Sequence, residues 1–410
     1  MQDPHTAHAH AQPSVLASMR KDLADHREWV ARCIVLSYAA LAGASVVGFT
    51  WLSERALHGF MLLNREEPLA PFVWTPAVCA LVVWITRRWF PGTAGSGIPQ
   101  VIAALRPEVA PAQRGRFVSL RLAVAKIGLT AAGLVGGLAI GREGPAVQIA
   151  AGVMLHARRW LPQDVSIKPH GLLVAGGAAG IAAAFNAPLA GVMFAIEELT
   201  PRIEQRSSGL LVAAIVLAGL VAVSAFGNST YFGVIRVPAL HADFIGPAVL
   251  VAVLAGLLGG VFSRLLHASS AGGADVFSRC KARYPVRFAA GCGLAIACIG
   301  WASGGATFGS GYDFTRSLVA GQTALPLLYV TLRLVATWLA IWSGVPGGLF
   351  APSLAIGAGL GSDVALLCAY DAAPPALIAL GMAGFLAAIT QAPITAFIIV
   401  MEMVDGHSMV

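Results

Sequence analysis

The stretch AAGIAAAFNAPLAGVMFAIEE, residues 178–198, recurs half a chain later as AGFLAAITQAPITAFIIVMEM, residues 383–403. The two stretches share paired alanines, an Ala-Pro step and an apolar run that ends in Glu, and Pro188 and Pro393 stand 205 positions apart. Self-similarity at half the chain length indicates two homologous halves.

A second pair of stretches recurs in the same order. GREGPAVQIAAG, residues 141–152, matches GGLFAPSLAIGAG, residues 347–359, when Pro145 is set against Pro352. Each member breaks an apolar run with Gly and Pro at the corresponding place in its half. Such broken segments are typical of transporters whose binding site lies where two repeats meet.

The composition predicts a bilayer protein. Of the 410 residues, 57% are hydrophobic and 11% are charged, and the mean hydropathy is +0.75, which is outside the range of soluble proteins. Most charge-free runs reach the roughly 20 residues that cross the hydrocarbon core. These runs are 33–52, 68–86, 171–196, 207–235, 244–263, 288–312, 334–362 and 372–401.

The runs define the expected organisation of an all-α polytopic membrane protein. We expect residues 1–32 to form a cytoplasmic segment with an amphipathic helix, and residues 33–410 to form the transmembrane domain. Its repeats would cover about 33–205 and 207–410. The six cysteines are scattered without metal-ligand spacing, so no metal or cofactor is predicted.

The net charge of +7 does not indicate nucleic-acid binding. The basic residues stand in small clusters between apolar runs, as expected of loops and of helix ends whose side chains reach the membrane surface. An intramembrane enzyme is disfavoured too, because the sequence contains neither Gly-x-Ser-x-Gly nor His-Glu-x-x-His.

Glu143 is the first candidate site residue. It follows a long uncharged run, and Pro145 fits the first turn of a helix, so Gly144 onward is predicted to be a helix N-terminus inside the membrane. Such an end binds anions through unpaired N–H groups and the helix dipole. Ionised Glu143 would compete with the anion, and protonated Glu143 would leave. The alternative is a carboxylate that only caps the helix and pairs with Arg142.

Two further Gly-rich turns precede helices. Gly348, Leu349 and Phe350 in GGLFAP (347–352) lack a carboxylate and would offer backbone N–H groups to an anion. Ser96 in GSGIP (95–99) would add a hydroxyl donor.

Together GSGIP, GREGP and GGLFAP resemble, in order and spacing, the three signatures of the CLC family of chloride channels and transporters. The resemblance covers the chain from about residue 35. It implies two inverted repeats with broken and re-entrant helices, a homodimer with one anion pathway per subunit, and a multi-pass location in the bacterial inner membrane. It gives Ser96 a role in coordinating the central anion and Glu143 the role of external gate.

Glu198 decides between the two mechanisms in that family. Glu197 has a counterpart in Glu402, whereas Glu198 aligns with Met403. An acid present in both halves is expected to be structural, as a helix-end partner, and the unduplicated Glu198 is expected to have a local role. By resemblance it falls on the internal proton-transfer glutamate of exchangers, although an interfacial acid facing water stays an alternative.

The sequence therefore predicts a chloride/proton antiporter, with a passive chloride channel as the alternative. A fluoride/proton antiporter is disfavoured by Ser96 and by Pro145, and nitrate stays open. The family often supplies a Tyr hydroxyl to the central anion after a Glu-Met-x-Asp stretch. Here His407 follows that stretch and no Tyr occurs after Tyr370. His407 is therefore a candidate hydrogen-bond donor to the anion, with a loose chain terminus as the alternative. Since the family continues into one more helix, we expect that last helix to be absent from this chain.

Overall fold

A computed structural model of the chain describes residues 26–162, 165, 167–199, 208–227, 231–232, 235–236, 242–273, 275–321, 328–370, 374–402 and 404–405. Nearly all of this structure is helical. The strands in these ranges are a single two-residue parallel pair, β1 (Ile235–Arg236) with β2 (Val404–Asp405). The prediction of an all-α protein is confirmed.

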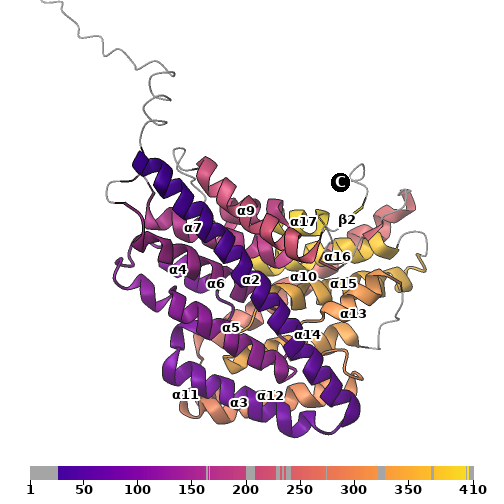
Figure 1. The fold of residues 1–410 in the computed structure, drawn as a ribbon. Helices are drawn as coiled ribbons and strands as arrows, with labels where there is room; N and C mark the ends of the chain where they lie inside the picture. Colours follow the sequence, from indigo (N-terminus) through magenta and orange to yellow (C-terminus); the bar gives the residue numbers. More distant parts are fainter. Residues whose placement is uncertain are drawn as a thin grey trace, which may run out of the picture.

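Figure 1 colours the helices in chain order. Up to residue 227 they are α2 (His26–Glu66), α3 (Pro71–Trp89), α4 (Ile98–Leu105), α5 (Leu120–Val135), α6 (Glu143–His156), α7 (Pro169–Phe185), α8 (Pro188–Phe194) and α9 (Ser208–Phe226). From residue 242 on they are α10 (Ile245–Ala271), α11 (Val276–Arg283), α12 (Pro285–Ala302), α13 (Tyr312–Val319), α14 (Tyr329–Ser343), α15 (Phe350–Leu367), α16 (Pro374–Thr390) and α17 (Pro393–Met401).

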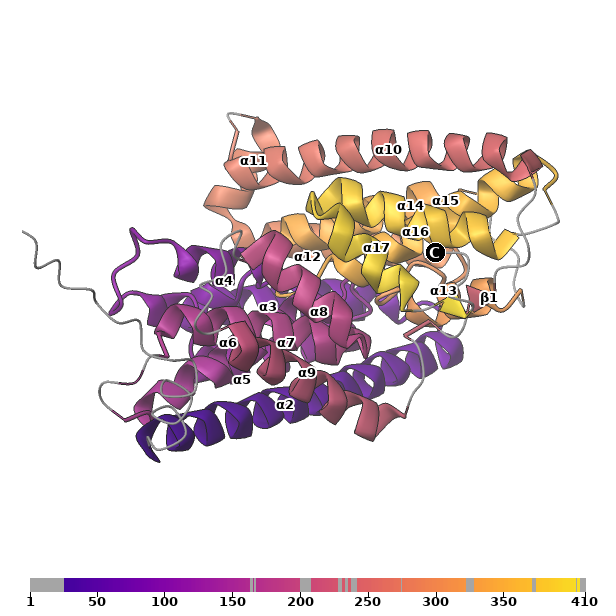
Figure 2. The ribbon, with the colours of Figure 1, turned by 90° about the horizontal axis from the view of Figure 1, so that it is seen from above.

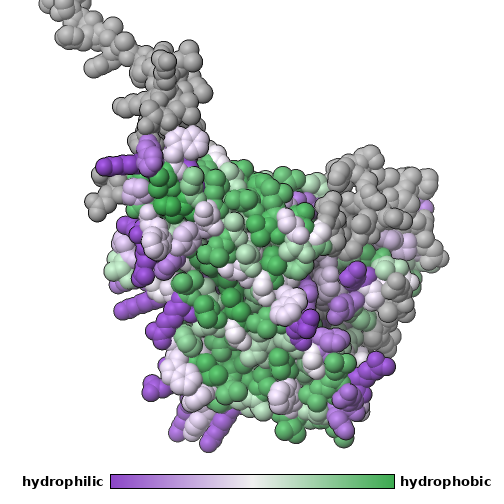
Figure 3. Space-filling view, viewed as in Figure 1, coloured by the Kyte–Doolittle hydropathy of each residue, from purple (hydrophilic) through white to green (hydrophobic). Residues whose placement is uncertain are grey.

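The protein is a multi-pass integral membrane protein. Six helices within the described ranges are long and apolar enough to cross a membrane. Hydrophobic residues cover the middle of the face in Figure 3, and hydrophilic side chains gather along two opposite margins. The helix α2 begins at His26 and continues past residue 33 without a break, so the division predicted at that residue falls inside a helix.

The repeated Ala-Pro step ends one helix and starts the next in both halves. Asn186 and Gln391, the residues before it, have positive φ of 56° and 60°. Pro188 and Pro393 then open α8 and α17 in the first-turn position, where a missing N–H does no harm. Thus α7–α8 and α16–α17 are the same broken unit, one in each half (Figure 2).

Small residues allow the helices that carry the repeated motifs to pack closely. A Cβ added at Gly180 on α7 would lie 2.6 Å from the Ala146 carbonyl oxygen on α6. In the second half, a Cβ on Gly361 of α15 would overlap the carbonyl of Leu377 on α16. Such contacts are the usual basis of helix association in lipid, and they place α6 and α15 in equivalent surroundings.

Equivalent carboxylates cap the broken helices across the two halves. Glu402, at the end of α17, accepts hydrogen bonds from the backbone N–H groups of Leu189 (3.2 Å) and Ala190 (2.9 Å) in the first turn of α8. Glu197 accepts from Ile394 (3.0 Å) and Thr395 (2.7 Å) in the first turn of α17. These bonds satisfy N–H groups that lack intrahelical partners. The prediction that this duplicated acid is a helix-end partner is confirmed.

Candidate functional site

The three Gly-rich motifs, far apart in sequence, meet at the centre of the molecule. Gly141 donates its N–H to the Gly348 carbonyl (2.8 Å), and Gly348 donates to the Gly141 carbonyl (2.7 Å). Gly347 donates to the Gly95 carbonyl (3.1 Å). Backbone hydrogen bonds therefore join GREGP of the first half to GGLFAP of the second, and GGLFAP to GSGIP.

Glycines are required here because the three segments approach one another too closely to leave room for side chains. A Cβ on Gly144 would lie 2.5 Å from the Ser96 hydroxyl oxygen, and one on Gly348 would lie 2.9 Å from the Gly144 nitrogen. Ser96 therefore lies against the first turn of α6. The expectation that the Gly348 N–H is a free anion donor is wrong for this conformation, since that N–H bonds to Gly141.

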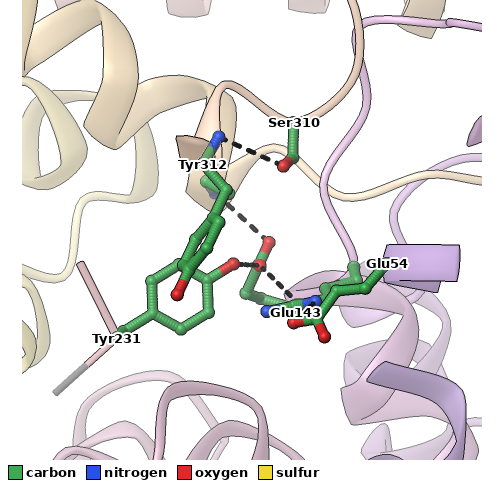
Figure 4. Close-up of polar contacts among 7 residues, drawn as sticks. Glu54, Glu143, Tyr231, Ser310 and Tyr312 are labelled. Atoms are coloured by element: carbon green, nitrogen blue, oxygen red, sulfur yellow. Dashed lines mark hydrogen bonds and ion pairs between the residues drawn. The ribbon is translucent and has the colours of Figure 1, made fainter. Parts of the chain in front are cut away.

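Glu143 occupies the point where the halves join. Its side chain is completely buried, and Figure 4 shows the carboxylate facing the Tyr231 ring. The Tyr231 hydroxyl donates to Oε1 at 2.5 Å, and the backbone N–H of Ala351, in the first turn of α15, donates to Oε2 at 3.2 Å. A buried carboxylate is thus placed at the helix N-terminus of the opposite repeat, where the dipole favours negative charge.

Leu349 and Phe350 lie at the start of the same helix α15. Their N–H groups precede the first intrahelical bond, so an anion can accept from them when Glu143 is elsewhere. The Phe350 side chain is 5% exposed and covers the site from the side of Phe185, whose ring centroid lies 6.1 Å away.

Arg142 pairs mainly with Glu54 and not with its neighbour Glu143. Its Nη1 lies 2.8 Å from Oε1 of Glu54, while its Nε lies 4.0 Å from the Glu143 carboxylate. The guanidinium lies over the rings of Tyr231 (5.3 Å) and Tyr312 (5.5 Å). It lines one wall of a vestibule of about 600 Å³. The alternative that Glu143 serves only to pair with Arg142 is therefore disfavoured by the geometry.

Sequence reasoning missed Lys126 on α5. This side chain is fully buried, and its ammonium donates to the carbonyls of Thr93 (2.8 Å) and Gly95 (2.6 Å). It fixes the turn that presents Ser96. A single Lys inside an apolar stretch is the signal that points to such a role. Tyr231 was also missed, and its place between two membrane helices gave no comparable signal.

Glu198 lies on a five-residue π-helical turn, Ala195–Leu199, that follows α8. Such turns are frequent at functional sites. Its carboxylate is half-buried and makes no hydrogen bond or ion pair within the described part of the chain. Glu198 thus differs in its contacts from its neighbour Glu197, which caps α17. His407 lies outside the described residues.

These contacts bring together the segments that carry Ser96, Glu143, Gly144, Gly348, Leu349 and Phe350. A family model described as voltage gated chloride channel matches residues 78–410. The chain belongs to the voltage-gated chloride channel family.

Members of this family that resemble the chain over most of its length carry a common name. The H(+)/Cl(-) exchange transporter ClcA of Vibrio parahaemolyticus is 30% identical over 433 residues, covering 97% of this chain and 88% of its own. The protein of that name from Cronobacter sakazakii is 29% identical over 392 residues, covering 90% and 81%.

Solved structures of the family share the fold. A slow cyanobacterial Cl-/H+ antiporter superposes with a TM-score of 0.76 at 23% identity, covering 92% of this chain and 90% of its own. A CLC-type fluoride/proton antiporter gives a TM-score of 0.72 at 23% identity, covering 90% and 93%. The CLC-type fold of two inverted repeats with broken helices is confirmed.

Proposed function

We propose that this protein is a secondary active transporter, not an enzyme, that exchanges chloride for protons across the membrane. The observation that carries the proposal is the Glu143 carboxylate at the N-terminus of α15, held by Ala351 and Tyr231. A carboxylate in this place uses the same donors that a chloride ion would use. The family's exchange transporters agree with this reading.

The exchange depends on one side chain in two protonation states. Ionised Glu143 accepts both hydrogen bonds and keeps the anion out. Protonated Glu143 loses its attraction to the helix dipole and its acceptor strength toward Tyr231, so it leaves and chloride takes the vacated donors. Each release of the gate therefore carries one proton away from the site as an anion enters.

Proton coupling requires a second acid that reaches the other side of the membrane. Glu198 suits this role because its carboxylate makes no hydrogen bond or ion pair within the described structure, whereas its neighbour Glu197 is committed to capping α17. Anions would pass by Ser96, and protons would move between Glu198 and Glu143. The two paths share only the gate.

A liposome assay that records chloride and pH together tests the proposal. An imposed chloride gradient, with the membrane potential fixed by potassium and valinomycin, should drive protons against their own gradient. Glu143→Ala should abolish proton movement and leave chloride flow. Chloride flow without proton movement in the unmodified protein would instead establish a passive channel.

The same assay separates chloride from fluoride. Ser96 against the first turn of α6 supplies a hydroxyl donor to a large anion, which favours chloride. We expect proton movement with chloride and little with fluoride. The reverse preference would assign the protein to the function named for its fluoride-transporting structural relative.

We further infer a homodimer in the bacterial inner membrane, the kind of membrane expected from the bacterial relatives. Helices α8, α9 and α17 and the π-helical turn after α8 carry large apolar side chains that are 39–56% exposed: Leu189, Ile196, Val212, Leu220, Ile394 and Phe397. A second copy can cover this face. Single-molecule photobleaching in liposomes should give two steps per particle, and Leu189→Trp should reduce that fraction.

A further inference from the structure

A groove of about 410 Å³ lies between α11, α12 and α14, away from the anion site. Figure 2 shows α11 at the outer edge of the helix assembly. The walls of the groove are mostly aromatic and aliphatic: Phe277, Tyr284, Phe288, Leu339 and Trp342. Because the outer surface of a membrane protein faces lipid, a groove of this composition accommodates an acyl chain.

An unpaired donor points to a polar group in the ligand. The indole Nε1 of Trp342 is buried and has no hydrogen-bond partner, although buried indole N–H groups usually find one. The ring is fixed by Phe288 (4.9 Å between ring centroids) and by stacking on Trp338 (4.8 Å). The neighbouring Trp338 indole, by contrast, donates to Ser269 at 2.7 Å.

Cations gather at one end of the groove. Arg283 and Arg287 each place the guanidinium carbon 5.3 Å from the centre of the Tyr284 ring. Lys281 lies two residues before Arg283 on α11, and Arg287 lies in the first turn of α12. The acid at this corner, Asp275, is already committed, because it accepts the Ser278 N–H at 2.9 Å and caps α11. Within the described part of the chain, neither Asp275 nor any other acid forms an ion pair with these cations.

The helix α11 has the character of a segment that lies in the membrane surface. Val276 and Phe277 are apolar and 69% and 63% exposed, and three cations follow within the next six residues. A short helix with exposed apolar side chains and basic residues rests at the boundary between headgroups and acyl chains. The groove thus opens at the depth where lipid phosphates lie.

We propose that this groove binds one anionic phospholipid. Its phosphate would lie between Arg283 and Arg287, an ester or phosphate oxygen would accept from Trp342, and an acyl chain would lie along Phe288 and Leu339. A zwitterionic lipid brings its own cation toward these arginines and gains less. At ~5.4-fold for each cation near an anionic headgroup, two arginines give a preference of roughly 30-fold.

Native mass spectrometry of the purified full chain tests the proposal with phosphatidylglycerol and phosphatidylcholine of identical acyl chains. We expect one tightly retained phosphatidylglycerol, and about 30-fold weaker retention in the double variant Arg283→Gln/Arg287→Gln. The matched control Arg158→Gln/Arg159→Gln removes two arginines from the turn after α6, outside the groove, and should retain the lipid as the unmodified protein does.

Trp342→Phe provides a second readout that does not depend on charge. It keeps an aromatic wall and removes the donor, so we expect weaker retention of phosphatidylglycerol without a change in the circular dichroism spectrum. Equal retention of the two lipids, or a double variant indistinguishable from the control variant, would overturn the proposal. Because lipid retention is measured without transport, its outcome is independent of the proposed exchange activity.

Discussion

Replacing Tyr231 by Phe should weaken the closed state of the gate. The hydroxyl makes the shorter of the two hydrogen bonds to the Glu143 carboxylate, 2.5 Å against 3.2 Å for the Ala351 N–H. A hydrogen bond to a charged group contributes about 1.5–3 kcal/mol. Its loss lowers the ratio of closed to open gate about 10- to 100-fold. The ring and its packing on Phe185 and Phe232 are retained.

The assay is the time course of chloride-driven proton uptake in liposomes at one fixed pH. Because the lost bond stabilises the closed gate, the open gate becomes more populated in the variant. The initial rate of uptake should therefore rise. Tyr312→Phe is the matched control, since its ring contacts Tyr231 edge-on at 5.0 Å and no hydroxyl bond to Glu143 is lost. A Tyr231→Phe profile that overlays that of the unmodified protein would refute the reasoning.

Three further predictions follow from neighbouring contacts. Glu198→Gln should abolish chloride-driven proton uptake while sparing chloride flux. Coupled proton movement that persists in this variant would contradict the proton-transfer role of Glu198. Lys126→Met removes two charge-assisted bonds to buried carbonyls, so chloride affinity by calorimetry should fall at least about tenfold; unchanged affinity would contradict its role. Glu402→Gln should lower the free energy of unfolding by about 1 kcal/mol, and Glu197→Gln should match it. A large difference between this pair would contradict their equivalence.

Much of the fold could be predicted because its helices break at residue types whose backbone conformation is restricted. Pro188 and Pro393 cannot continue a preceding helix, and their spacing revealed the repeat. The backbone conformation of the residue two places before each proline was harder to predict from the sequence. Asn186 adopts positive φ readily, but Gln391 does not do so by preference. Only its place in the repeated unit, packed against the opposite half, imposes a φ of 60°.

The sequence predicted the motifs of the candidate site but not the residues that hold those motifs in place. Ser96, Glu143 and Gly144 could be identified from the sequence because Gly-rich turns before helices bind anions. Lys126 was overlooked although a lone Lys within an apolar stretch is a signal of such a role, because its closeness to Arg121 also suits a membrane boundary. Tyr231 belongs to a linker, and its contact with Glu143 depends on tertiary folding alone. The bonded N–H of Gly348 likewise required knowledge of the strand-like pairing between the halves.

That pairing limits how the transporter can change shape. Sliding one half past the other would break the two Gly141–Gly348 bonds, the Gly347–Gly95 bond and both carboxylate caps, Glu197 and Glu402. Each broken bond costs about 1 kcal/mol, and more where a buried group is left unpaired. Rotation of the Glu143 side chain breaks only two bonds. We therefore expect the two halves to stay fixed relative to each other during transport, and the Glu143 side chain to be the part that moves.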